Sequence, residues 1–166
     1  MGKVYGELWT YDMVLNRWQL EKCENLPETG ASSVLRLWKS HLFLFGGTQY
    51  PFGDVMDNTL HYCTLNSDQT VYKWRTISVD RSLPLVEPKR GYGAGVVAYK
   101  GYFYVFGGAI GLYDNPLNDL HRIQLHPSSK DNKSLPRWEK VSCEEDESLP
   151  LGCYRMELAL DTARQW

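Results

Sequence analysis

The amino-acid sequence predicts an all-β protein built from repeated four-stranded units, and two observations support this fold class. First, residues 38–47 (WKSHLFLFGG) recur 61 positions downstream as residues 99–108 (YKGYFYVFGG). Each run is too short for a buried helix and is rich in strand-forming residues, so a buried strand is the better interpretation. Second, no part of the chain shows the 3.6-residue apolar period of a helix.

Further markers keep nearly the same offset and define a repeating unit. Both runs end in two glycines, where the backbone can bend or approach another backbone without a Cβ in the way. A polar tetrapeptide containing histidine and then a lone tryptophan follow each glycine pair. The markers are residues 27–30 (PETG), 58–61 (NTLH) and Trp74 in one copy, and residues 88–91 (PKRG), 118–121 (NDLH) and Trp138 in the next.

The unit is about 55 to 65 residues long and contains four short strand patterns. An incomplete earlier copy contributes two patterns and Trp18, and a truncated later copy contributes one. Prolines and the polar segment 126–136 separate the patterns, as turns and loops do. We expect strands at residues 6–12, 17–22, 31–37, 41–46, 58–65, 71–78, 93–99, 102–107, 119–125, 137–142 and 155–161.

Four antiparallel strands in each repeat predict the blades of a β-propeller, whose neighbours must stack because one blade cannot bury both of its faces. The expected blade parts are residues 6–25, 26–80, 84–143 and 149–166, of which the middle two are complete. Because closed propellers have ~4 to 8 blades, we interpret the chain as a fragment of a longer propeller. The isolated chain is expected to self-associate through bare apolar blade faces.

The composition excludes several function classes. A net charge of −2 and a pI of about 6.1 give no general attraction to nucleic acid or to anionic membranes. The sequence has no apolar run long enough for a membrane-spanning helix and no signal-peptide layout. Its four cysteines form no metal-ligand spacing and no disulfide framework, so we expect reduced thiols and a cytoplasmic or nuclear location. No nucleophile motif or phosphate-binding loop appears, so no cofactor, metal or catalytic residue is expected.

The Phe-Gly-Gly runs, the Asn-x-Leu-His tetrapeptides and the spaced tryptophans together resemble kelch repeats along essentially the whole chain. Residues 45–53 (FGGTQYPFG), 119–122 (DLHR) and 154–159 (YRMELA) resemble the kelch domain-containing protein ten type, although that type has His where this chain has Met156. The resemblance implies a substrate receptor of a cullin-RING ubiquitin ligase that captures protein C-termini ending in glycine. No stretch of this sequence resembles the box that recruits elongin and cullin.

Propeller loops on one face carry the candidate binding residues, because binding groups concentrate on loops held by a rigid scaffold. Arg90 and Arg155 lie in turns that lead into first strands, so both are expected near the mouth of the central channel. A guanidinium there could hold a terminal carboxylate through paired hydrogen bonds. Alternatively, each arginine ties adjacent blades together. Four aromatic residues on the same loops could contact a peptide or pack between blades: Tyr50, Phe52, Tyr92 and Tyr113.

We therefore predict a non-enzymatic module that recognises a protein or peptide. His61 and His121 share one repeat position and are expected to form structural hydrogen bonds within their blades, and Trp18, Trp74 and Trp138 are expected to anchor the core. Two alternatives stay open. One is a scaffold, for example one that binds actin. The other is an enzyme of the galactose-oxidase kind, which would need tyrosine, histidine and cysteine ligands around copper, and no such set is recognisable.

Overall fold

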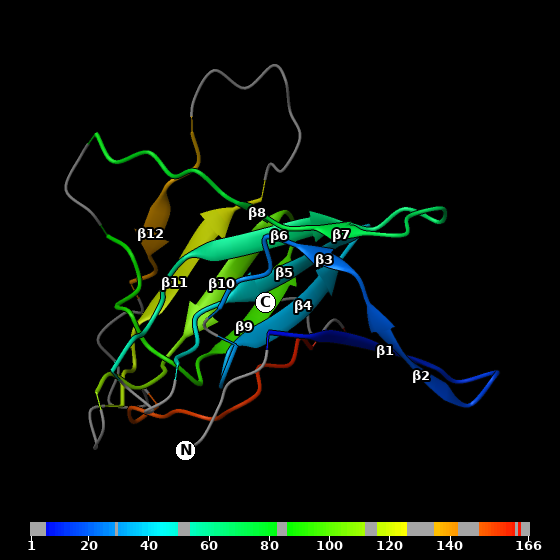
Figure 1. The fold of residues 1–166 in the computed structure, drawn as a ribbon. Helices are drawn as coiled ribbons and strands as arrows, with labels where there is room; N and C mark the ends of the chain where they lie inside the picture. Colours follow the sequence, from blue (N-terminus) through cyan, green and yellow to red (C-terminus); the bar gives the residue numbers. More distant parts are fainter. Residues whose placement is uncertain are drawn as a thin grey trace.

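The computed structural model describes residues 6–28, 30–49, 54–82, 86–111, 116–125, 135–142, 150–161 and 163. Regular structure in these ranges consists of β-strands (Figure 1), which confirms the predicted all-β class. Among the described residues there is no helix long and apolar enough to span a membrane. Tyr50, Phe52 and Tyr113 lie outside the described ranges, as do the loop residues 126–134 and the acidic stretch 143–149.

Two four-stranded antiparallel sheets form the body of the molecule, and in each the strands follow one another in chain order. Both sheets contain the same tight connection between their first two strands, at residues 39–40 and 100–101, where Lys39 and Lys100 adopt positive φ angles. The first sheet consists of β4 (Val34–Trp38), β5 (His41–Phe45), β6 (Leu60–Thr64) and β8 (Arg75–Thr76). The second consists of β9 (Gly95–Tyr99), β10 (Tyr102–Phe106), β11 (Leu120–Gln124) and β12 (Trp138–Lys140).

The core lies between these two sheets. Phe43 and Phe45 on β5 face Phe103 on β10, with ring centroids 6.0 and 6.2 Å apart, and Trp138 lies 5.6 Å from Phe45. The alternation of side chains along a strand explains the pattern, because Phe103 and Val105 are buried while the residues next to them are less so. Neighbouring repeats therefore bury each other's faces, as stacked propeller blades do.

The two ends of the described chain differ from the prediction. A hairpin of β1 (Leu8–Asp12) and β2 (Arg17–Glu21) projects from the body (Figure 1), and its Trp18 is 66% exposed. The prediction that Trp18 is a core anchor is wrong, since no described sheet covers that face of the hairpin. Trp74 and Trp138, which belong to complete sheets, are buried as predicted.

Residues 155–161 form no strand, so that prediction is also wrong. A strand requires a hydrogen-bonded neighbour, and no described segment pairs with these residues along their length. They still pack on the second sheet, because a Cβ added to Gly95 would lie 2.8 Å from Leu158. The segment thus lies against β9 without belonging to a sheet.

A short parallel pairing joins the hairpin to the first sheet. β3 (Cys23–Glu24) pairs with β7 (Tyr72–Lys73), and the amide of Trp74 donates to the carbonyl of Glu24 at 3.0 Å. The strand predicted at residues 71–78 is therefore split at Trp74, with β7 turned towards β3 and β8 towards β6. This pairing was not predicted.

The same backbone contacts join successive repeats at both junctions. The second glycine of each pair donates to the next repeat, from Gly47 to Gly91 at 3.1 Å and from Gly108 to Cys153 at 2.9 Å. Gly91 donates back to Asp57 at 3.2 Å, and Cys153 donates in the same way to Leu117 at 3.1 Å. One contact pattern repeated at nearly the same spacing is what a propeller requires to turn each blade about a common axis.

Candidate recognition surface

The turns that lead into the first strands of successive repeats line up at one end of the sheets. Ser32, Gly93 and Arg155 occupy equivalent positions in these leading turns, and all three have positive φ, at 53°, 66° and 54°. The Gly93 amide donates to the Ser32 carbonyl at 2.9 Å, and the Arg155 amide donates to the Gly93 carbonyl at 2.7 Å. A Cβ on Gly93 would lie only 2.9 Å from the Arg155 nitrogen, so glycine permits this close approach.

Arg155 is an exposed residue supported by two aromatic rings. Its guanidinium carbon lies 5.6 Å from the centre of the Tyr154 ring, which in turn meets the edge of the Tyr92 ring at 6.1 Å. The Tyr92 hydroxyl donates to the Gly111 carbonyl at 3.2 Å. This stack holds the guanidinium at the surface, and contact with an aromatic face leaves its N–H groups able to bind an anion.

An aromatic residue in these turns could contact a peptide or pack between blades, and Tyr92 and Tyr154 differ in which of these roles they fit. Tyr92 is 8% exposed and packs between leading turns, whereas Tyr154 is 39% exposed beside Arg155. Tyr154 is therefore better placed to contact a ligand, and sequence reasoning did not single it out. Aligning the repeats would have identified it, because Tyr154 follows Tyr92 at an offset of 62, close to the repeat period.

Arg90 is also exposed, but it stands at a different place in its turn. It precedes Gly91, whereas Arg155 is the equivalent of Gly93, so the two arginines do not share a repeat position. Neither forms an ion pair with a described carboxylate. The four arginines that do form such pairs are Arg36, Arg81, Arg122 and Arg137.

The arginine that ties blades together is Arg36, which the sequence analysis overlooked. From the middle of β4 its Nε donates to the Val96 carbonyl on β9 at 3.1 Å, and its guanidinium pairs with Glu157. One side chain thus links three successive repeats. An arginine within an otherwise apolar strand (VLRLW) is the signal that could have identified it, since a charge at that place requires partners.

Asp57 fixes the loop that meets the next leading turn. Its Oδ1 accepts hydrogen bonds from the Asn58 and Thr59 amides and from the Thr59 hydroxyl, at 2.8, 3.0 and 2.6 Å. Its Oδ2 lies 3.1 Å from His61 Nε2, and His61 Nδ1 lies 3.2 Å from Thr76 Oγ1. The predicted structural hydrogen bonding of His61 within its blade is confirmed.

Burial alone would raise the pKa of the Asp57 carboxyl, but hydrogen bonds from His61 and Thr59 outweigh it and lower that pKa to about 2. At the equivalent histidine of the next repeat, burial lowers the pKa of His121. A carboxylate that accepts several hydrogen bonds is stabilised in its charged form. Asp57 is thus charged at neutral pH, and its hydrogen bonds stabilise this loop.

We expect Asp57→Asn to lower the free energy of unfolding by about 2 kcal/mol at pH 7, the amount that a pKa lowered to about 2 represents. The folded pKa lies below the unfolded one, so this contribution is complete above pH ~4 and disappears as the pH falls through about 2. Urea denaturation at pH 7 and pH 3 measures it, with the exposed Asp54→Asn as the matched control. An unchanged difference between the two pH values would contradict the assignment.

Among the described residues, no three His, Cys, Asp or Glu side chains lie together in a way that could hold a metal ion. The surface formed by the leading turns instead combines exposed guanidinium groups with an exposed aromatic ring, on a scaffold fixed by backbone hydrogen bonds. Such a surface is suited to binding a polypeptide.

The fold and this surface define a kelch-repeat module of the protein-interaction class. No family model matches the chain. Kelch domain-containing protein 10 of Homo sapiens is 32% identical over 164 residues, or 97% of this chain and 33% of that protein. The Xenopus tropicalis protein of that name is 31% identical over 165 residues, and the Drosophila melanogaster homolog 31% over 163 residues.

The chain has the kelch-repeat fold and is similar to the Kelch domain-containing protein 10 type over 97% of its length. It spans about a third of the length of the curated vertebrate relatives, since it covers 33% of the human protein and 35% of the Xenopus tropicalis protein.

Proposed function

We propose that the surface of leading turns captures the free C-terminus of a protein substrate, with Arg90 and Arg155 holding the terminal carboxylate. The observation that carries the proposal is that both arginines are exposed in leading turns of successive repeats without a described carboxylate partner, while Arg36 performs the blade-tying role. Tyr154, and with it the more buried Tyr92, would pack against the residues before the terminus. Tyr50, Phe52 and Tyr113 complete the set of candidate contacts from the same loops.

A terminal carboxylate suits this pair of residues physically. A guanidinium presents N–H groups in a planar fork that matches the two carboxylate oxygens, which a lysine ammonium cannot do. The preference for a free terminus therefore follows from charge, whereas the preference for terminal glycine is what the resemblance implies.

The resemblance to the Kelch domain-containing protein 10 type extends the proposal to the cellular role. In that role the chain is the recognition part of a cullin-RING ubiquitin ligase receptor in the cytoplasm or nucleus. Elongin and cullin would be recruited by another segment of the polypeptide. The module has no catalytic step of its own, because the receptor positions a substrate for a separate ligase.

We expect Arg155→Ala and Arg90→Ala in the complete protein each to weaken binding of a glycine-ending peptide on the order of 10- to 100-fold, the value of a charge-assisted hydrogen bond. Arg155→Lys should restore part of the loss, because charge is retained without the planar fork. Arg75→Ala is the matched control, since Arg75 is exposed on β8 and forms no ion pair with a described residue. Fluorescence anisotropy measures the affinity, and equal losses in all three alanine variants would contradict the proposal.

A further inference from the structure

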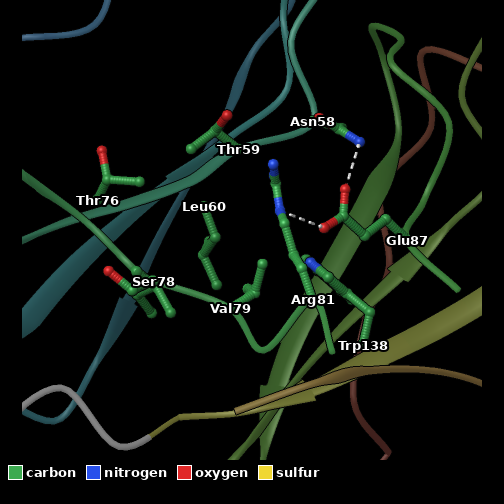
Figure 2. A pocket seen from close by; sticks show the side chains of 10 residues that line it. Asn58, Thr59, Leu60, Thr76, Ser78, Val79, Arg81, Glu87 and Trp138 are labelled. Carbon is green, nitrogen blue, oxygen red and sulfur yellow. Dashed lines mark hydrogen bonds and ion pairs between the residues drawn. The ribbon is translucent and has the colours of Figure 1, made fainter. Parts of the chain in front are cut away.

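A cavity of about 250 Å³ lies at the junction of the two complete sheets (Figure 2). Leu60 and Val79 from one repeat and Trp138 from the next form apolar parts of its wall. The segment that follows β8 reaches the neighbouring repeat here, where the Asp80 amide donates to the Pro136 carbonyl at 2.9 Å. The cavity therefore lies between two repeats that a backbone hydrogen bond joins.

The charged groups in its wall are Glu87 and Arg81. Glu87 Oε1 is shielded from solvent and accepts no hydrogen bond from a described residue. Its ion-pair partner is Arg81, whose Nε lies 3.4 Å from Glu87 Oε1 and whose side chain is 67% exposed. The Asn58 amide lies 3.5 Å from Glu87 Oε2 but is only 2.8 Å from the Pro88 carbonyl, so its closer partner is the backbone.

A shielded carboxylate oxygen without a protein hydrogen-bond donor favours a donor that reaches it through the cavity. The exposed Arg81 compensates for the missing donor only weakly, since ion pairs with a solvated partner at such distances contribute little. A donor that entered the cavity would be held by Glu87 and would displace Arg81 outward. The hydroxyls of Thr59, Thr76 and Ser78 also line the cavity and could accept the remaining protons of such a donor.

We propose that this cavity binds a primary ammonium group on a short apolar stem, namely the side chain of a lysine on a protein partner. The stem packs against Leu60, Val79 and Trp138, the ammonium donates to Glu87, and Arg81 is the group that it displaces. A volume of about 250 Å³ is sufficient for one such side chain. The inference does not depend on the proposed capture of a C-terminus, because it uses none of the same residues.

The test is titration of the complete protein with n-butylammonium, followed by ¹H–¹⁵N NMR of the Trp138 indole, which is assigned from its absence in Trp138→Phe. We expect saturable shifts, and we expect n-butanol and butyrate at equal concentrations to produce none. Glu87→Gln should weaken n-butylammonium binding at least 10-fold. Arg81→Ala should strengthen it several-fold, because the competing cation is removed.

The sign of the Arg81→Ala effect distinguishes the proposal from an anion site, where losing the guanidinium would weaken binding. Glu139→Gln serves as the matched control, since Glu139 is a half-exposed carboxylate paired with Arg122 on the neighbouring strand, and it should leave the affinity unchanged. Absence of a saturable shift at Trp138 would overturn the proposal. Weaker binding in Arg81→Ala, or equal binding in Glu87→Gln, would overturn it as well.

Discussion

Replacing Phe103 by alanine is expected to lower the free energy of unfolding by about 3–5 kcal/mol, the usual cost of deleting a buried aromatic ring. Phe103 is fully buried on β10, and its ring meets both Phe43 and Phe45 across the junction of the two sheets. The substitution removes packing from both sheets at once. A loss of this size is a large share of the ~5–15 kcal/mol that stabilises a typical domain.

Urea denaturation followed by tryptophan fluorescence measures this effect, because Trp138 reports on the same junction. Phe103→Leu is the matched control and should cost ~1.5 kcal/mol or less, since most of the apolar volume is retained. If Phe103→Ala cost no more than Phe103→Leu, the two sheets would not be packed against each other as described.

The second large effect is expected for Gly107→Ala. Gly107 has a φ of +66°, where a side chain costs about 1–2 kcal/mol, and a Cβ there would lie 2.6 Å from the Cys153 carbonyl oxygen. That carbonyl accepts the hydrogen bond from Gly108 that joins this repeat to the next. The alanine methyl must therefore disrupt the junction in addition to straining the backbone, and we expect a loss above 2 kcal/mol.

Gly101→Ala separates the two contributions. Gly101 also has a positive φ, at +83°, but nothing lies within 4 Å of the position its Cβ would occupy. It should therefore show the conformational cost alone. Thermal unfolding of both variants makes the comparison, and equal destabilisation would mean that Gly107 does not mediate contact between repeats.

The sequence was sufficient to predict the strands that belong to complete repeats, except that the strand expected at 71–78 is split at Trp74, because the repeated strands were each marked twice. The aromatic runs that became β5 and β10, and the glycines after them, recur with the same spacing and have the same surroundings. Features that occur once were harder to predict. The pairing of β3 with β7 involves two residues from each strand, and so short a parallel contact leaves no period in the sequence.

The strands that surround each tryptophan explain its burial, and its position in the repeat does not. Trp74 and Trp138 are buried because each belongs to a repeat with a complete four-stranded sheet, whereas Trp18 lies on a two-stranded hairpin. The same residue type at the same repeat position therefore has different burial. Burial depends on which neighbouring sheet is present, and a local pattern does not contain that information.

The sequence identified the turns that form the candidate surface but not the contacts within them. The leading turns were identified from repeated glycines and prolines, and Arg90 and Arg155 do lie in them. Sequence spacing could not show that Arg155 is stacked on Tyr154, because that contact depends on a positive φ at Arg155 and on the Tyr92 ring beneath. Nor could it show Arg36 reaching Val96, which is 60 residues away along the chain.

The most direct test of the central claim compares one glycine-ending peptide as the free acid and as the C-terminal amide, titrated against the complete protein by isothermal calorimetry. The account predicts that the acid binds on the order of 100-fold more tightly, because the amide cannot offer a carboxylate to Arg90 and Arg155. Binding of both peptides with the same affinity would contradict capture of a C-terminus, and this surface would then be a site for internal peptide segments.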